Sequence, residues 1–275
     1  MLKEALEHLL TPCPRRWRKM GYLREQIAID ARVARNRQAW APHLEATKRE
    51  IVEAVERSRG RRCVLVLGAG VHHDLPLDAL VAAFERVVLA DIVHRPGARR
   101  AARRVGGHVV CAEFDASGVA ARLHEAGARM DDSALEACVT EAEVGLPVEC
   151  GGEPNLVVSA NLCSQLLLLP FEWIARRRER GSGLKTRLVA AGARHHARWL
   201  ESRTGAMLLV SDLERRKVSR DGTEVEMEEV PGMTELRPPD RRWNWRLAPI
   251  PEFNRTHHLE HIVGAWRRSP LLKVS

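Results

Sequence analysis

The sequence predicts an open α/β fold in which a doubly wound, mostly parallel sheet follows a set of N-terminal helices. Three observations lead to this prediction. Residues 1–60 have apolar positions only at helical spacing. From residue 61 onward, short continuous apolar runs alternate with amphipathic helical segments, as in a parallel sheet covered on both faces. After about residue 214 the runs alternate in polarity, which is typical of antiparallel strands.

The N-terminal segment is expected to be helical throughout. Ile27, Ala31 and Leu44 recur at roughly helical spacing, and a Ser-Arg-Gly sequence at 58–60 ends the pattern. The helical segment carries several basic side chains, of which we expect one or two to contact an anionic ligand and most to face solvent. These are Arg24, Arg32, Arg35 and Arg37.

Five buried strands are expected in the central part of the chain, and four helices between or after them. The strands lie within 63–70, 86–92, 107–115, 154–162 and 205–214. The helices lie within 77–85, 97–105, 166–178 and 184–202. The acid-rich stretch 130–154 has the weakest pattern and is interpreted as a helix followed by a surface loop.

The C-terminal part predicts antiparallel strands. Asp221-Gly222 lies between alternating segments and indicates a hairpin. Two more strands are expected at 241–251 and 257–268, which brings the sheet to seven strands and places an antiparallel strand near its C-terminal end.

Composition limits the class of protein. With 45% hydrophobic residues the chain can bury a large core, and it has no apolar run near the ~20 residues that a membrane span needs. We therefore expect a cytoplasmic protein that does not interact with membranes. The six cysteines form no Cys-x-x-Cys pair, so we expect reduced and mostly buried thiols.

The net charge of +8 favours anionic partners. Nucleic acid is a possible partner but is not favoured, because only four Phe and one Tyr are available for stacking on bases. The arginine clusters are interpreted first as solvated helix faces.

A glycine turn directly follows the first buried strand. Gly68-Ala69-Gly70 comes after "VLVL", and this position lies at the carboxyl end of a parallel sheet, where open α/β folds bind ligands. Glycine permits backbone angles that other residues avoid and allows a ligand to approach the main chain. On its own, such a turn merely connects a strand to a helix.

An acidic residue at the end of the second strand changes that interpretation. Asp91 ends "VVLAD", where its carboxylate can accept hydrogen bonds from both hydroxyl groups of an adenosine ribose. The turn and the acid together predict a nucleotide-type cofactor.

The residues after the turn separate two adenosine cofactors. A dinucleotide pyrophosphate favours a third small residue at the start of the helix, but this chain has His72-His73-Asp74 in that region. A carboxylate beside a pyrophosphate is unfavourable. S-adenosylmethionine has no phosphate, and its amino-acid end tolerates a looser, charged turn.

In the order of its strand motifs, the chain resembles the class I S-adenosylmethionine-dependent methyltransferases, which have a Rossmann-like fold. The resemblance depends on a succession of five motifs over roughly residues 60–266: "VLVLGAG", "VVLADI", "VVCAEFD", "PNLVVSAN" and "AMLLVSD". It implies S-adenosyl-L-methionine as the cofactor and methyl transfer as the reaction. It also implies that residues 1–60 form a cap over the site, with the methyltransferase domain at 61–275.

The resemblance assigns the cofactor-binding residues position by position. The turn Gly68, Ala69 and Gly70 lines the methionine part, while Asp91 and the adjoining Ile92 lie at the ribose. Asp115 faces the adenine amino group, and Glu113 is a weaker alternative because it lies within the strand. Ser159, Ala160 and Asn161 are placed beside the transferable methyl group.

Some features depart from the family pattern. The acidic residue usual before the first glycine is absent, and "SAN" is not the Asn-Pro-Pro-aromatic signature of enzymes that methylate amino groups of nucleic acids. The sequence therefore favours a small-molecule methyl acceptor. The extended "GAGVHHDLPL" loop resembles that of nicotianamine synthase, so an aminocarboxypropyl transferase is one alternative. A cofactor- or RNA-binding protein without catalytic activity is a second alternative, and a nicotinamide-dependent reductase is a third.

Candidate catalytic residues come from the same loops. His72 and His73 are the first candidates for a general base, because histidine titrates near neutrality. Asn161 and Gln165 can orient a substrate. His257 and His261 in "THHLEH" are interpreted as strand residues, and no metal site is predicted, because no second group of ligands accompanies them. Trp243 and Trp245 are expected to pack against the sheet.

Overall fold

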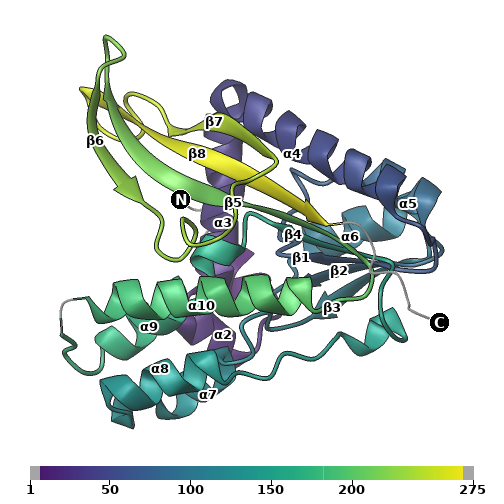
Figure 1. The fold of residues 1–275 in the computed structure, drawn as a ribbon, viewed down its shortest axis with the longest axis horizontal. Helices are drawn as coiled ribbons and strands as arrows, with labels where there is room; N and C mark the ends of the chain where they lie inside the picture. The colour runs from purple at the N-terminus through teal and green to yellow at the C-terminus, as the bar shows by residue number, and fades with distance from the viewer. Residues whose placement is uncertain (1–6, 182, 269–275) are drawn as a thin grey trace.

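The computed structural model describes residues 7–181 and 183–268. Its centre is an eight-stranded sheet whose main path has the order β3-β2-β1-β4-β5-β8-β7, with β6 paired to β5 (Figure 1). The parallel strands are β1 Val64–Leu67, β2 Val87–Asp91, β3 Val109–Glu113, β4 Leu156–Ala160 and β5 Ala206–Ser219. The antiparallel strands are β6 Glu224–Glu229, β7 Arg241–Ala248 and β8 His257–Arg268.

This topology confirms the predicted Rossmann-like, mostly parallel sheet. From β1 the chain builds outward through β2 and β3 on one side, then returns to continue through β4 and β5 on the other. The seven strands of the main path match the predicted sheet, and the antiparallel β8 lies between β5 and β7. Because the order reverses at β1 and β4, the carboxyl ends of these strands border the crevice where such sheets bind ligands.

Two layers of helices cover the sheet, one on each face. One face carries α4 Arg37–Arg57, α5 Leu77–Ala83 and α6 Pro96–Val105. The other carries α2 Arg15–Met20, α7 Ala120–Ala126, α8 Asp132–Thr140, α9 Leu168–Ala175 and α10 Leu184–Glu201. Short 3₁₀ turns η1 Gly127–Arg129, η2 Val148–Cys150 and η3 Cys163–Gln165 complete the connections. The two layers lie on opposite sides of the sheet in Figure 1.

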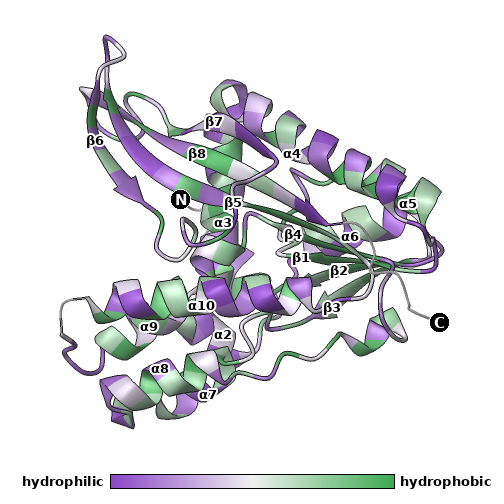
Figure 2. Ribbon diagram, viewed as in Figure 1, coloured by the Kyte–Doolittle hydropathy of each residue, from purple (hydrophilic) through white to green (hydrophobic). Residues whose placement is uncertain are grey.

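Alternation along the central strands produces two separate cores. In β1, Val64 and Val66 face the α4 layer, whereas Leu65 and Leu67 face the α10 layer, and all four are fully buried. Strands buried on both faces need continuous apolar sequence. Figure 2 shows this in the hydrophobic colour of β1, β2 and β4. Burial on both faces explains why the sequence predicted these strands well.

The outer part of the sheet is polar. Strand β5 continues to Ser219, past the expected end near residue 214, and forms the predicted hairpin with β6. All six residues of β6 are exposed, and two of its acidic residues lie opposite basic residues of β5: Glu228 opposite Arg215 and Glu226 opposite Lys217. Figure 2 shows mostly hydrophilic colour on this hairpin.

The N-terminal helices have different positions. Helix α3 Tyr22–Arg35 lies against the loops that follow β1 and β2, through the contacts described below. Helix α4 instead packs on the sheet, with Trp40, Ile51 and Val55 in one of its cores. The division of the chain at residue 60 remains a prediction, and residues 1–6 and 269–275 of the two predicted domains lie outside the described residues.

Two simple predictions can be compared with the described residues. All six cysteines are free thiols, and four of them are buried. No helix within 7–181 and 183–268 combines the length and apolarity that crossing a membrane requires.

Candidate functional site

The predicted glycine turn lies at the carboxyl end of β1 and needs glycine at its first position. Gly68 has φ +72°, and its N–H donates to the Ala90 carbonyl at 3.0 Å. A Cβ atom at Gly68 would lie 2.9 Å from Leu162 Cβ and 3.0 Å from the Ala160 carbonyl oxygen. The turn is therefore packed tightly against the end of β4 and has no room for a side chain. Ala69 is buried in the α4-side core.

Asp91 and the glycine turn are in direct contact at this edge of the sheet. The Gly70 N–H donates a 2.8 Å hydrogen bond to Asp91 Oδ2, and the Val93 N–H lies 3.4 Å from Oδ1. Burial raises the pKa of Asp91, and the nearby His94 opposes that shift. The side chain of the adjoining Ile92 is turned into the α10-side core, so this residue adds only its backbone to the edge of the sheet.

Asp115 shapes the loop that follows β3. Its Oδ1 accepts hydrogen bonds from the Ser117 N–H at 3.0 Å and the Ser117 hydroxyl at 2.6 Å, and its Oδ2 accepts from the Ala120 N–H at 2.8 Å. Most of the acceptor capacity of this carboxylate is thus used within its own loop. Glu113 is exposed on β3 and forms an ion pair with Arg99 at 2.8 Å.

Tyr22, at the start of α3, lies near both Asp91 and Asp115. Burial raises the pKa of its phenol well above the ordinary value, and the negative charges of Asp115 and Asp91 raise it further. No pattern in the sequence singles out this residue, which is the single tyrosine of the chain. It is partly buried against the α10-side core.

The end of β4 holds Asn161 in an uncommon conformation. Its φ is +53°, and its side-chain amide donates to Asp74 Oδ2 at 2.8 Å. The predicted neighbours on β4 are core residues: Ser159 is fully buried, with its hydroxyl 2.9 Å from His196 Nε2, and Ala160 faces the α4-side core. Of the predicted "SAN" set, Asn161 is the side chain that reaches the loop after β1.

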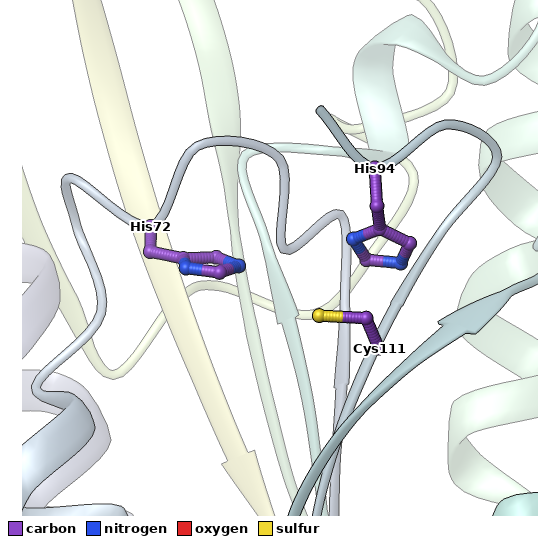
Figure 3. Close-up of side chains that lie close together, drawn as sticks. All are labelled: His72, His94 and Cys111. Atoms are coloured by element: carbon purple, nitrogen blue, oxygen red, sulfur yellow. The ribbon is translucent and has the colours of Figure 1, made fainter. Parts of the chain in front are cut away.

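The two histidines of the loop after β1 have different surroundings. His73 Nε2 lies 2.7 Å from Asp30 Oδ1 of α3, and the His73 side chain is 36% exposed. His72 is buried, has φ +68° and has no hydrogen-bond partner at either ring nitrogen. Burial lowers its pKa to about 4, so the ring is neutral near pH 7. Figure 3 shows that His72 points toward His94 and Cys111.

Helix α3 is tied to the loop after β2 by polar contacts. The Gln26 side-chain amide donates to the Val93 carbonyl at 2.8 Å, and Arg95 lies 3.0 Å from Asp30 Oδ2. Arg95 also pairs with Glu7 and donates to the Gln26 carbonyl at 3.3 Å, with its side chain only 8% exposed. Asp30 therefore holds one residue from each of two loops, His73 and Arg95, beside the glycine turn.

The four arginines singled out in the N-terminal segment contribute less. Arg24 lies 3.6 Å from Glu25 with 63% of its side chain exposed, and Arg35 pairs with Glu252 at 2.8 Å. Arg37 is exposed and Arg32 is half-buried.

A second histidine–carboxylate pair lies at the junction of β5 and β8. His261 Nδ1 is 3.2 Å from Asp212 Oδ2, and the Ser164 hydroxyl donates to the same oxygen at 3.2 Å. Although burial alone raises the pKa of Asp212, the His261 ring holds it below the ordinary value. The pair depends on the register of antiparallel strands, so no pattern in the sequence indicates that these residues meet.

The tryptophans of β7 pack as expected. Trp245 is buried, stacks on His43 with ring centroids 3.9 Å apart, and meets Trp40 edge to face at 4.9 Å. Trp243 donates through its indole N–H to His43 Nδ1 at 3.1 Å.

Comparisons with known proteins find a fold-level likeness. No family model matches the chain, and no curated protein sequence matches it significantly. A 1,6-didemethyltoxoflavin-N1-methyltransferase from Burkholderia thailandensis, solved with its substrate and S-adenosylhomocysteine, is similar at 15% identity and a TM-score of 0.37. That match covers 89% of this chain and 87% of the other.

Two further solved structures are similar. A sugar N-methyltransferase from Streptoalloteichus has 14% identity and a TM-score of 0.34, covering 82% of this chain and 87% of its own. A glycopeptide N-methyltransferase complexed with S-adenosyl-L-methionine has 14% identity and a TM-score of 0.34, covering 78% and 75%. With TM-scores below 0.5, any functional assignment depends on the topology and side chains of this chain alone.

Proposed function

We propose that this protein is an S-adenosylmethionine-dependent methyltransferase that acts on a small molecule. The observation that carries the proposal is the contact between the glycine turn and Asp91. The Gly70 N–H reaches Asp91 Oδ2 at 2.8 Å, at the sheet edge beside the switch point. One Asp91 oxygen is thus held toward the turn, and the carboxylate retains acceptor capacity for a ribose diol.

The character of the loop after β1 supports this cofactor over a dinucleotide. Asp74 lies in that loop and is held by Asn161, so a carboxylate stands where a pyrophosphate would need close backbone N–H groups. The amino group and sulfonium of S-adenosylmethionine are cationic and are compatible with Asp74 and Asp91. In this proposal Gly68, Ala69 and Gly70 line the methionine part, and Asp115 with Tyr22 borders the adenine.

The position of α3 supports a small acceptor. Its contacts with His73, Val93 and Arg95 hold it across the loops that border the proposed cofactor site. A helix in that position leaves limited access for a macromolecule and can enclose a small substrate from water. In this proposal α3 forms the part of the cap that covers the site, whereas α4 packs on the sheet.

His73 is the residue that we assign as general base. Methyl transfer needs an in-line approach of the nucleophile to the sulfonium methyl, and a base where that nucleophile is protonated. His73 is partly exposed, and the Asp30 carboxylate orients its ring. The aspartate of a Ser-His-Asp triad orients the catalytic histidine in the same way. His72 is enclosed, so it lacks the access to substrate that a base requires.

Calorimetry tests the cofactor directly. We expect S-adenosylmethionine and S-adenosylhomocysteine to bind with one site per chain, and NADH not to bind. Tight NADH binding, or salt-sensitive binding of structured RNA without binding of S-adenosylmethionine, would overturn the proposal. Where turnover with candidate acceptors is found, the coproduct distinguishes two reactions. S-adenosylhomocysteine indicates methyl transfer, and methylthioadenosine indicates aminocarboxypropyl transfer.

Asp91 provides the sharpest variant for this test. Asp91→Ala removes charge-assisted hydrogen bonds worth about 1.5–3 kcal/mol, so we expect at least about tenfold weaker binding of S-adenosylmethionine. Asp78→Ala is the matched control, because Asp78 is exposed on α5 close to the same loop. Unchanged affinity in a folded Asp91→Ala protein would show that the cofactor lies elsewhere.

A further inference from the structure

Three potential metal ligands converge beside the glycine turn. They are His72 in the loop after β1, His94 in the loop after β2, and Cys111 within β3 (Figure 3). The ligand atoms of all three lie within 4.8 Å of one another. They come from three neighbouring strands, because β2 pairs with both β1 and β3 and Cys111 is in register with Leu89.

The two imidazoles are buried without the partners that such groups normally have. His72 is 8% exposed and His94 is 3% exposed. Both nitrogens of His72 and Nδ1 of His94 have no hydrogen-bond partner. A buried polar atom without a partner costs about 1–3 kcal/mol, so three such nitrogens in one place indicate an absent ligand.

The second contact of His94 determines which nitrogen is available. His94 Nε2 lies 2.8 Å from the Ala112 carbonyl oxygen, which can only accept, so Nε2 carries the proton. The lone pair is then on Nδ1, the atom without a partner. Histidines that bind metal characteristically donate their other N–H to a carbonyl or carboxylate, which fixes the ring as seen here.

Cys111 supplies the third ligand, and its sulfur is anionic when it binds a metal. Its thiol is half-buried on the side of the sheet that α6 covers. The thiolate is the form that binds metal, so binding of the ion displaces the thiol proton.

From this arrangement we propose a zinc site formed by His72, His94 Nδ1 and Cys111 Sγ, with water as the fourth ligand. An ion among three atoms at most 4.8 Å apart lies within about 2.8 Å of each, against bond lengths of about 2.0–2.3 Å. Side-chain shifts of under about 1 Å therefore complete the coordination. Two imidazoles and a thiolate suit Zn²⁺ better than a hard cation, which prefers oxygen.

Binding of the ion would have a structural consequence for the loop after β1. His72 has a left-handed backbone, φ +68°, which a residue other than glycine adopts only when its surroundings hold it there. A bond from its ring to zinc would join this loop to β2 and β3. The ion would then act as a staple of the fold, independent of whether the protein is a methyltransferase.

Metal analysis of the full-length protein tests the site. Purified protein dialysed against zinc is expected to hold one equivalent, and zinc at a hundredfold excess over its Kd to raise Tm by about 5 °C. In the cobalt-substituted protein, a thiolate-to-cobalt charge-transfer band in the near ultraviolet is expected, because the proposed site contains sulfur.

Single substitutions separate the site from adventitious binding. His72→Asn keeps a residue that tolerates the left-handed conformation, and Cys111→Ser changes one atom. Each is expected to weaken zinc binding by at least about 100-fold, more than the loss of an outer partner causes. Cys13→Ser and His108→Asn are the controls, because both residues are partly buried and lie outside the cluster.

The outcomes are distinct. Loss of zinc and of the cobalt band in folded His72→Asn and Cys111→Ser, with both retained in the two controls, supports the site. If folded wild-type protein holds no more zinc than the Cys111→Ser variant, the proposed zinc site is overturned. Water is then the partner of the two imidazoles. Neither the zinc measurement nor the cobalt spectrum uses S-adenosylmethionine. A negative result for the zinc site is therefore separate from failure of the proposed methyltransferase function.

Discussion

Asn161, at the end of β4, donates a 2.8 Å hydrogen bond from its side-chain amide to Asp74 in the loop after β1. The contact bridges the point where the strand order reverses, and it joins the two loops that border the proposed cofactor site. Burial raises the pKa of Asp74, and the amide of Asn161 opposes that shift. Asn161 and His72 are the two residues other than glycine with positive φ among those that the structure describes, and both lie at this edge of the sheet. Strained backbone of this kind gathers at functional sites.

Substitutions at Asn161 are expected to separate the hydrogen bond from the backbone conformation. Asn161→Gly and Asn161→Ala both remove the bond to Asp74, at a cost of about 1–3 kcal/mol in the free energy of unfolding. Alanine also has to adopt φ near +53°, which costs about 1 kcal/mol more than glycine. Urea denaturation of both variants checks the order. Equal stabilities would show that the backbone at residue 161 relaxes.

Gly68 is expected to be intolerant of any side chain. Gly68→Ala places a Cβ 2.9 Å from Leu162 Cβ at φ +72°, so we expect a loss of about 1–3 kcal/mol in stability and weaker binding of S-adenosylmethionine. Gly97→Ala is the control. A Cβ there has no atom within 4 Å, and Gly97 lies in α6, so stability should rise by up to about 1 kcal/mol. Thermal denaturation and calorimetry measure both effects.

The proposed base is expected to affect turnover more than binding. His73→Gln removes the proton acceptor, so kcat should fall by about 10²–10⁴-fold once a protonated acceptor is known, with little change in cofactor Kd. Asp30→Asn should reduce kcat less, because it removes only the group that orients His73. A His73→Gln protein with unchanged kcat would show that His73 is not the base.

Acid is expected to destabilise the fold through buried histidines. Burial lowers the pKa of His43 and of His196 from an ordinary value of 6.5 to about 4. Between these values the unfolded chain binds protons that the folded chain does not, so stability falls as pH decreases from 6.5 to 4. The slope is at most about 1.4 kcal/mol per pH unit for each histidine.

A pair of variants checks the origin of this slope. His196→Gln should flatten the pH dependence of the unfolding free energy over that range. Ser159→Ala removes the hydroxyl that lies 2.9 Å from His196 Nε2 but leaves the imidazole, so it should lower stability without flattening the slope. A slope in His196→Gln equal to that of the wild type would contradict the assignment.

The sequence by itself determined the strands, their succession along the chain and the mostly parallel sheet, because strands buried on both faces require continuous apolar runs that no loop resembles. It also placed Gly70 and Asp91 at the same edge of the sheet, since the carboxyl ends of adjacent parallel strands share one edge. Asp115 lies after β3 as predicted, although its hydrogen bonds within that loop had no signature in the sequence.

Only the tertiary structure decided which side chains meet across elements that are distant in the chain. Ser159 and Ala160 follow the strand into the two cores, so the alternation of β4 leaves Asn161 as the reaching side chain. His73 lies beside Asp30 because α3 packs against the loop after β1. His72 lies beside His94 and Cys111 because the loops after β1 and β2 adjoin β3. Such meetings depend on the packing of layers and on strand register. Local periodicity gives neither, and for that reason the sequence predicted no metal site where the folded chain brings three ligands together.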